Sequence, residues 1–597
     1  MPQNFHKKIA HYAHIVNNFD QNAILFHNDT ITLNKKYKIG KITVHSGKFY
    51  LYSYLDAKDF YIDLEDLHGA NEGDLILARV IFNPRGRLKV KVALMIEKNL
   101  EQLLVIFQNG SFITVKNGNH IHLDHNINPK EGEIYLIDKE ECKYFGHIND
   151  PMVDEKISLY LYKEEYRLDH YDTKNIDSQI SFENRIDLTH LDFCTIDPIG
   201  AKDHDDAIYY DPMNSILYVA IADVSHYVKI GTKLDEEAKR RAFSAYFPSH
   251  VLPMLPFVLS SDLCSLKPNQ LRYAYVCKME IDTQKLIVKK SEFIEAVIES
   301  KNNFSYEMVD EMIETNTLSV NLQALLDLTQ QIRKQRLIHG YDFRNDEFRL
   351  ILDNNEKLIG VNPEHSTISH QLVEECMLLA NQESAKKIGN FGIFRVHDEP
   401  DMKKIDKLIE DLANIGILIK KKKDIHTTIL AIQKEAARFG VEKEVDKLII
   451  KAQQQAHYSS HIGAHFGLGF SHYSHFTSPI RRYSDLTLHR ILKTKKVPED
   501  IDDICEKISS TERQIAQMVW DLEGRKYVRW AKEHLHEKLS ATITDVGDHI
   551  QCELNEPWSG LSFRLINHQG EKLYSKIDVE LLEADLISKK ITGKLVN

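Results

Sequence analysis

The sequence predicts a multidomain α+β protein in which small β-barrels flank one large α+β domain, and three observations lead to this prediction. The chain has 597 residues, which is enough for about three to five domains of ordinary size. Short apolar runs that alternate with polar residues fill both ends of the chain, whereas long helical patterns occupy its middle. With 43% hydrophobic and 27% charged residues, the composition is that of a globular protein and excludes a disordered or fibrous chain.

The composition also limits the cellular setting and the partners. The cysteines are scattered without zinc-ligand spacing, so we expect a reducing compartment and no disulfide framework. No stretch reaches the ~18 consecutive apolar residues of a membrane span, and the first residues carry His and Lys where a signal peptide needs an apolar region. We therefore expect a cytoplasmic protein with no membrane partner. Its formal net charge of -12 means that binding of a polyanion has to rest on local basic surfaces.

The first predicted barrel spans residues 35–98 and follows an N-terminal extension, residues 1–34. Five short strands separated by Gly and Asn-Pro turns are typical of an oligonucleotide-binding (OB) barrel. The segment holds 12 basic and 8 acidic residues, and Tyr50, Tyr52 and Tyr54 share one face of a strand. Such a barrel can hold a single-stranded nucleic acid by charge and by base stacking. The alternative is an aromatic face that packs against a neighbouring domain.

The remaining domains follow from changes in this rhythm. Residues 99–165 repeat the short strands and predict a second, less basic OB-like barrel. Residues 166–535 combine helical patterns such as LIEDLANIGILI with apolar strands such as YVAIADV, and they predict one large α+β domain. Residues 536–597 return to short strands and predict a third barrel, which holds 7 basic and 10 acidic residues.

A dense group of carboxylates follows an apolar, strand-like run near the start of the large domain. The segment DFCTIDPIGAKDHDDAIYYD places Asp197, Asp203, Asp205 and Asp206 within ten residues. Carboxylates held this close repel one another unless a cation neutralises them, and hard oxygen ligands select Mg²⁺ or Mn²⁺. An EF-hand does not fit, because its loop needs a glycine and a bidentate glutamate in a register that this segment lacks. Acidic residues exposed in a surface loop are the alternative for this segment taken alone.

A second segment, HFGLGFSHYSHFTSPIRRYSDLTLHR, supplies groups that can bind a phosphate. Arg481 and Arg482 follow a Thr-Ser-Pro turn, and a guanidinium can bind phosphate oxygens through two parallel hydrogen bonds. Together with the carboxylates, these arginines indicate metal-assisted phosphoryl transfer. The alternative is that both arginines form internal salt bridges, for example with Asp485 on the following helix.

Six blocks occur in order across most of residues 190 to 490: TIDPIGAKDHDDA, IADVSHYV, RAFSAYFPSHVLPMLPFVLSSDLCSL, LVEECMLLAN, FRVHDEP and the segment from HFGLGF to LHR. In these blocks the sequence resembles the catalytic (RNB) domain of the ribonuclease II and ribonuclease R family, with a closer likeness to ribonuclease R. The resemblance implies two cold-shock-like OB barrels, an RNB domain and a C-terminal S1-like barrel. It also implies a processive, hydrolytic 3′→5′ exoribonuclease that acts on the 3′ end of single-stranded RNA and releases nucleoside 5′-monophosphates. We expect a monomer.

The resemblance further implies a role for each matching residue. Asp197 and Asp206 match the principal Mg²⁺ ligands, for which Mn²⁺ can substitute, while Asp203, as a further ligand, and Asp205 complete the acidic site. Arg481 would balance charge on the phosphate in the transition state. The implied RNA contacts are two aromatic residues that stack on nucleotides, two residues that touch ribose, and one arginine: Tyr246 and Phe343, Tyr306 and Glu374, and Arg482. Without the family, a lone aromatic residue more often belongs to the core.

Two other functions are compatible with the pattern. A catalytically silent RNA-binding or regulatory protein could keep the RNB shell, although such a protein has no chemical reason to retain four mutually repelling carboxylates. A deoxyribonuclease could use the same metal site, and only the implied ribose contacts argue against it.

Overall fold

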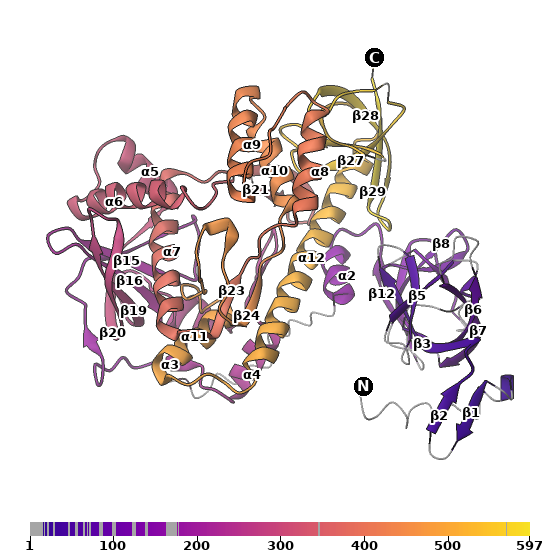
Figure 1. Cartoon of the computed structure of the whole chain (residues 1–597), viewed down its shortest axis with the longest axis horizontal. Helices are drawn as coiled ribbons and strands as arrows, with labels where there is room; N and C mark the ends of the chain where they lie inside the picture. Colours follow the sequence, from indigo (N-terminus) through magenta and orange to yellow (C-terminus); the bar gives the residue numbers. More distant parts are fainter. Residues whose placement is uncertain are drawn as a thin grey trace. The chain divides into compact units, whose positions relative to one another are not determined.

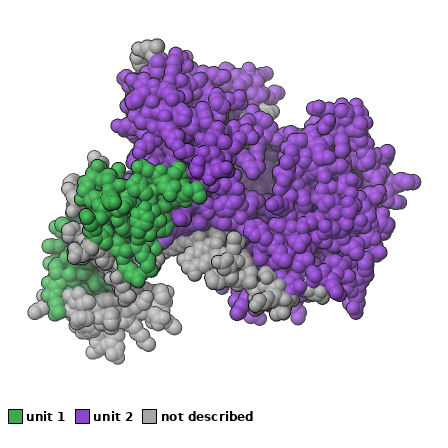
Figure 2. Space-filling view, turned by 180° about the vertical axis from the view of Figure 1, so that it is seen from behind, with its two compact units in different colours: residues 1–153 green, residues 154–597 purple. Residues whose placement is uncertain are grey.

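The structure is a computed structural model (Figure 1) and describes residues 16, 18–20, 23–27, 30–45, 48–53, 58–63, 66–68, 70, 73–82, 88–97, 103–116, 118–121, 127–137, 141–162, 176, 178–343, 347–547, 549–568 and 570–596. The chain folds as two compact units, residues 1–153 and 154–597 (Figure 2). Small β domains accompany one large α+β domain, which confirms the predicted fold class.

The first unit contains a hairpin of β1 (Ile24–His27) and β2 (Thr30–Leu33), which lies inside the predicted extension. A closed barrel with strand order β3-β4-β5-β7-β6 follows. Its strands lie within the predicted range 35–98, and they are β3 (Tyr37–His45), β4 (Lys48–Ser53), β5 (Lys58–Ile62), β6 (Leu75–Phe82) and β7 (Leu88–Glu97).

Side chains alternate along β4 as the sequence pattern requires. Phe49 and Leu51 are buried in the barrel, whereas Tyr50 and Tyr52 are turned outward and Tyr52 is 42% exposed. Tyr50 also makes an edge-to-face contact with Tyr61 of β5, with ring centroids 5.7 Å apart. The outward aromatic face is therefore present on these strands, and Tyr54 lies outside the described residues.

The segment predicted as a second barrel is an open five-stranded sheet in the part that the structure describes, with strand order β10-β9-β8-β11-β12. Its strands are β8 (Leu103–Gln108), β9 (Ser111–Thr114), β10 (His120–Ile121), β11 (Glu133–Ile137) and β12 (Cys142–His147). The structure also places the end of this domain before residue 165, because helix α2 (Val153–Leu161) lies against α12 (Ile501–Glu533) in the second unit. Ser158 donates to Asp521 at 2.7 Å, a partner 363 residues away that no local pattern could reveal.

The large domain is built on a six-stranded sheet of order β13-β20-β14-β15-β16-β19. The long strand β20 (Ile287–Ser305) pairs with β14 and also with β19 (Leu271–Asp282). The strand pairing from β20 through β14, β15, β16 and β19 therefore closes on β20. The other strands are β13 (Ile186–Asp187), β14 (Phe193–Asp197), β15 (Asp206–Asp211) and β16 (Ile216–Ala222). Because β14 and β15 are apolar and mostly buried, their polar ends are held on a rigid core.

Helices pack beside this sheet, among them α6 (Val320–Arg336) and α7 (Ile368–Ile388), which lie next to each other (Figure 1). The helices are α3 (Val224–Tyr227), α4 (Lys233–Arg241), α5 (Tyr306–Glu314), α6 (Val320–Arg336), α7 (Ile368–Ile388), α8 (Met402–Ala413), α9 (Ile425–Phe439), α10 (Glu442–Ala452) and α11 (Tyr483–Thr494). The short strands form three two-stranded antiparallel sheets, β17 (Ala245–Tyr246) with β18 (Val251–Leu252), β21 (Glu347–Leu352) with β22 (Leu358–Glu364), and β23 (Phe391–Val396) with β24 (His457–His461). Helices α8, α9 and α10 share a separate hydrophobic core.

The predicted third barrel is present and closed, with strand order β25-β26-β27-β29-β28. Its strands are β25 (Lys538–Val546), β26 (Ile550–Leu554), β27 (Ser562–Ile566), β28 (Lys576–Asp585) and β29 (Lys590–Leu595). The barrel packs on α12, where the rings of Trp530 and Trp558 lie 4.3 Å apart. Nowhere in the described part of the chain is a helix long and apolar enough to cross a membrane.

Candidate active site

The four predicted carboxylates lie where two neighbouring strands are connected. β14 ends at Asp197 and β15 begins at Asp206, and because the two strands pair antiparallel, the loop between them folds back on itself. Gly200 has a φ of 83° in this loop, a left-handed conformation that glycine adopts without strain. Asp203 and Asp205 follow in the same loop, and Asp205 is only 4% exposed.

Burial and mutual repulsion act on these carboxylates. Burial raises the pKa of Asp205 well above its usual range, and the charges of Asp203 and Asp206 add to this shift. Burial and the charge of Asp197 raise the pKa of Asp206 to about 7. The nearest counter-charge is Arg481, whose Nε lies 3.4 Å from Oδ2 of Asp205. That oxygen is buried and has no hydrogen-bond partner among the described residues, so an acceptor is left over inside the acidic site.

An imidazole lies beside the carboxylates. Nδ1 of His204 is 2.7 Å from Oδ2 of Asp197, and the backbone N–H of His204 donates to the hydroxyl of Ser265 at 3.1 Å. Burial by itself would lower the pKa of His204, but the bond to Asp197 and the charges of Asp203 and Asp206 outweigh burial and raise it. His204 therefore offsets part of the negative charge of the site.

The arginine segment reaches the same site from a distant part of the sequence. The backbone N–H of Ile480 donates to Oδ1 of Asp205 at 2.9 Å, across a separation of 275 residues. Arg481 keeps 47% of its side chain exposed beside Asp205, and its Nη2 donates to the hydroxyl of Ser478 at 3.2 Å. The two sequence motifs thus form one site.

Arg482 has a different environment from its neighbour. Its Nε and Nη2 donate to the two carboxylate oxygens of Asp485 at 3.0 and 2.8 Å, and only 21% of its side chain is exposed. The interpretation as an internal salt bridge is therefore right for Arg482. Asp485 thus occupies the Nε and Nη2 edge of the guanidinium, and the contact of Arg482 with RNA stays a prediction.

Two of the predicted nucleotide contacts border the carboxylates. Tyr246 is 43% exposed at the end of β17, and its hydroxyl donates to Oδ2 of Asp203 at 3.1 Å. Tyr306 opens α5, and its ring stacks on His370 with centroids 3.6 Å apart. Burial raises the pKa of Tyr306, and the nearby charges of Asp206 and Asp197 raise it further. Both tyrosines therefore stand next to the acidic site.

The other two predicted contacts are grouped around Arg333 of α6. Glu374 on α7 is half-exposed, and its Oε2 accepts from Nη1 of Arg333 at 2.6 Å. Nη2 of Arg333 lies 3.0 Å from Oδ1 of Asp342, the residue before Phe343. The ring of Phe343 stacks on Tyr341 with centroids 5.5 Å apart. One arginine therefore fixes the carboxylate of Glu374 and the chain that carries Phe343.

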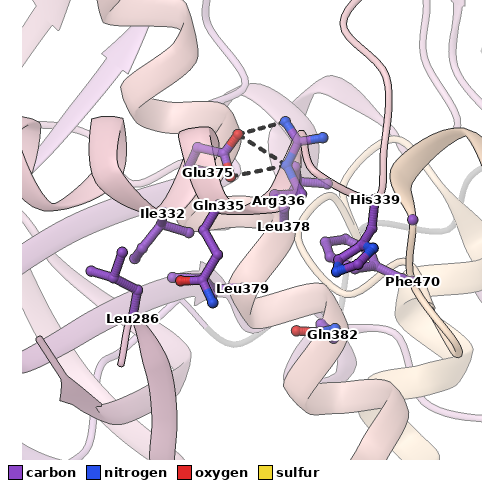
Figure 3. Close-up of a pocket in the computed structure, with 11 residues that line it drawn as sticks. Leu286, Ile332, Gln335, Arg336, His339, Glu375, Leu378, Leu379, Gln382 and Phe470 are labelled. Atoms are coloured by element: carbon purple, nitrogen blue, oxygen red, sulfur yellow. Dashed lines mark hydrogen bonds and ion pairs between the residues drawn. The ribbon is translucent and has the colours of Figure 1, made fainter. Parts of the chain in front are cut away.

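A cavity of about 180 Å³ adjoins this group (Figure 3). Arg336 and Glu375 line it as a buried ion pair, with Nη2 and Oε1 2.6 Å apart, and Nη1 of Arg333 also reaches Glu375 at 3.1 Å. Gln335 and Gln382 also line this cavity (Figure 3). None of the four aspartates lines this cavity, so it is separate from the acidic site.

The negative charge of the site and the unpartnered Oδ2 of Asp205 suit a hard divalent cation. The carboxylates are not already arranged around one cation position. Within the described residues, no three His, Cys, Asp or Glu side chains are arranged to hold one metal ion. Oδ2 of Asp197 is engaged by His204, and Oδ2 of Asp203 accepts from Tyr246. Asp197 and Asp203 would therefore have to turn away from these partners to bind a cation together with Asp206.

Comparison with known proteins identifies the family of this chain. The RNB domain family model matches residues 185–496, and ribonuclease R of Helicobacter pylori strain 26695 is 34% identical over 481 residues, covering 76% of this chain and 74% of the relative. The chain belongs to the RNB family. This confirms the resemblance identified from the sequence blocks, including its closer likeness to ribonuclease R.

Solved structures share the fold of this RNB protein. RNase R of Mycoplasma genitalium, at 24% identity, covers 94% of this chain and 100% of its own, with TM-scores of 0.82 in the apo form and 0.81 in complex with ribose methylated single-stranded RNA. Yeast Ssd1, described as a pseudonuclease, has a TM-score of 0.65 at 16% identity and covers 92% of this chain and 80% of its own. The shared fold is thus found both in a ribonuclease and in a pseudonuclease.

Sequence reasoning missed His204 and Arg333, and it treated Asp485 only as an alternative partner. His204 stands inside the acidic motif, so its position was a usable signal. Arg333 lies in an ordinary helical pattern, and only the packing of α6 on α7 reveals its partners.

Proposed function

We propose that this RNB protein is a Mg²⁺-dependent, processive 3′→5′ exoribonuclease that hydrolyses single-stranded RNA to nucleoside 5′-monophosphates. The observation that carries the proposal is the meeting of Ile480 and Arg481 with Asp205, which unites the acidic loop and the arginine motif. The family of the chain and the RNA-bound structure of the Mycoplasma relative support RNA as the substrate.

Each group in the site would then have a distinct task. Asp197, Asp203 and Asp206 would hold the cation, which when bound supplies an activated water and stabilises the leaving 3′-oxygen. The exposed guanidinium of Arg481 would donate to the phosphate oxygens as their charge develops in the transition state. Tyr246 would stack on a base near the 3′ end.

Selection of RNA over DNA would depend on groups that recognise the 2′-hydroxyl. Tyr306 stands at the edge of the acidic site, and Glu374 presents a half-exposed carboxylate that Arg333 orients. A carboxylate and a phenol can both bond to a ribose hydroxyl that deoxyribose lacks. We therefore expect matched single-stranded DNA to be degraded much more slowly than RNA.

The decisive experiment compares the wild type with Asp205→Asn on a 5′-labelled single-stranded RNA. The substitution keeps the shape of the side chain but removes its charge, so we expect kcat to fall ~10²-fold or more while RNA affinity changes less than about threefold. Excess EDTA should silence the wild type. Intact RNA in the wild-type lane with Mg²⁺ present would identify a silent RNA-binding protein, and equal loss of matched DNA would identify a general nuclease.

The direction of cleavage and processivity require separate readouts. A 5′-labelled RNA should shorten from its 3′ end, and mononucleotides should be released from the first seconds of the reaction. Addition of excess unlabelled RNA after binding should not change the pattern if the enzyme is processive. Accumulation of internal fragments would contradict the exonuclease proposal.

A further inference from the structure

Asp485 is fully buried in the first turn of α11, yet its carboxylate is well supplied with donors. Oδ1 accepts from the backbone N–H of Ser478 at 2.7 Å and from Nη2 of Arg482 at 2.8 Å. Oδ2 accepts from Nε of Arg482 at 3.0 Å and from the hydroxyl of Ser484 at 2.8 Å. Disturbing a buried charge that is held in this way is costly, so these bonds fix the shape of the turn from 478 to 485.

This turn presents two groups to the acidic site. Ile480 and Arg481 stand between the residues that Asp485 binds, and both face Asp205, one through its backbone N–H and the other through its guanidinium. The carbonyl of Arg481 also accepts from the backbone N–H of Ser244 at 3.0 Å. A shift of Ser478 or Arg482 would therefore move both contacts with Asp205.

A further hydrogen-bonded layer supports Ser484. Its hydroxyl lies 3.2 Å from the hydroxyl of Tyr458, which lies 2.8 Å from Nδ1 of His475. Tyr458 is buried, and the guanidinium of Arg395 lies over its ring at 4.7 Å. Asp485 is thus anchored to the interior of the domain, while the turn that it holds faces the carboxylates.

We infer that Arg482 and Asp485 form a positioning pair, which sets the geometry of Arg481 and Asp205, and that Arg482 acts through this pair and not on RNA. The inference rests on the proposed function, because the pair is expected to act at the phosphate that Arg481 binds. Groups that orient a catalytic residue from behind commonly contribute ~10 to 100-fold to activity or metal affinity.

The test uses the full chain and three variants. Arg482→Lys keeps the charge but cannot make the two-pronged contact, and Ser484→Ala removes a single bond to Asp485 and is the variant with the milder effect on folding. Arg490→Lys is the matched control, because Arg490 lies on the same helix and pairs with buried Asp235 at 2.8 Å. Thermal unfolding, kcat, KM, RNA affinity and Mn²⁺ affinity by titration calorimetry are measured for each variant.

We expect Arg482→Lys to lower kcat at least about tenfold with KM and RNA affinity within about threefold, and to weaken Mn²⁺ binding about threefold or more. Ser484→Ala should show the same trend with a smaller size, and Arg490→Lys should lower the unfolding temperature without changing kcat. When Arg482→Lys is added to Arg481→Ala, kcat should fall by less than a further factor of about three, because the positioned guanidinium is already absent.

The contrary outcomes are distinct. If Arg482→Lys weakens RNA binding and flattens its salt dependence at unchanged kcat, Arg482 contacts RNA and the inference is wrong. An equal loss of kcat in Arg490→Lys would reduce the pair to a structural role. If the wild type is inactive on RNA, the proposed function fails. If Mn²⁺ affinity is unchanged in Arg482→Lys, or if the wild type binds no Mn²⁺, the inference about the positioning pair is wrong as well.

Discussion

Arg481 carries an exposed guanidinium at the edge of the acidic site, while other groups of the domain remain available to hold an RNA strand. We therefore predict that Arg481→Ala lowers kcat by ~10²-fold or more and changes RNA affinity by less than about threefold. Single-turnover cleavage and equilibrium binding of the same RNA separate the two effects. A variant that loses affinity and keeps its maximal rate would instead make Arg481 a contact of the entering strand.

His489 illustrates a residue that matters for stability and not for chemistry. It is fully buried on α11, where one ring nitrogen bonds to the carbonyl of Phe476 at 2.8 Å, and burial lowers its pKa to about 4. The unfolded chain takes up this proton near pH 6.5, so the stability that neutral His489 provides is lost as the pH falls from about 6.5 to about 4.

At pH 5 this linkage should cost the wild type about 2 kcal/mol relative to pH 7, from this one histidine. His489→Gln can keep the bond to Phe476 but does not titrate, so its urea midpoint should fall less between pH 7 and pH 5. The exposed His190 gives the control variant His190→Gln, which should follow the wild type. Parallel slopes for all three proteins would show that other groups control the acid transition.

Residues of the site could be predicted from the sequence where a short motif contains the chemistry. Asp197, Asp203, Asp205 and Asp206 are close in the chain, so their mutual repulsion follows from the sequence alone. The role of Arg482 depends on whether a partner lies within reach of its guanidinium, and both possibilities fitted the same motif.

At the scale of elements, α2 shows what a local pattern cannot reveal. Asp154 near its start is completely buried, and it accepts two hydrogen bonds from Arg529 of α12 at 2.6 and 2.7 Å. Nζ of Lys526, itself buried, lies 3.4 Å from the same carboxylate. The alternating rhythm of residues 99–165 suggested strands throughout, because the partners of this helix are more than 350 residues away.

Removal of this carboxylate should loosen α2 from α12. Asp154→Ala removes the buried carboxylate that Arg529 and Lys526 share, and we expect a loss of about 3–5 kcal/mol in the free energy of unfolding of the second unit. Denaturant unfolding followed by tryptophan fluorescence can measure it, since Trp530 lies on α12. The control is Glu533→Ala on the same helix α12, which breaks an exposed ion pair with Lys357 from the turn before β22 and should shift the midpoint little.

At the scale of the whole molecule, the order of the domains was predictable because each domain has its own spacing of apolar and polar residues. That spacing did not show where the second domain ends and the large domain begins. The two end barrels have similar strand orders, β3-β4-β5-β7-β6 and β25-β26-β27-β29-β28, but they differ in charge. The first predicted segment, 35–98, holds 12 basic and 8 acidic residues, and the last, 536–597, holds 7 and 10. Any difference between the two barrels in RNA binding should therefore come from their charge more than from their fold.

Deletion of the barrels would not test this difference cleanly, because the last barrel supports α12. Lys589 pairs with buried Asp521, and Trp558 packs on Trp530, so truncation after about residue 535 would uncover the long helix. Paired substitutions of exposed cations avoid this problem. Lys41→Gln with Arg79→Gln changes the first barrel, and Lys572→Gln with Lys590→Gln changes the last by the same charge.

We predict that the first pair weakens binding of single-stranded RNA more than the second pair does. The first barrel combines a positive balance with the outward rings of Tyr50 and Tyr52, whereas the last barrel has a negative balance. Removal of one cation that binds a phosphate of a single strand should reduce the slope of log affinity against log salt by about 0.7. Fluorescence anisotropy at several salt concentrations gives both quantities, and thermal unfolding checks that each barrel is intact. A larger loss of affinity and slope in the second pair would mean that lysines gathered on one surface of the last barrel outweigh its net charge.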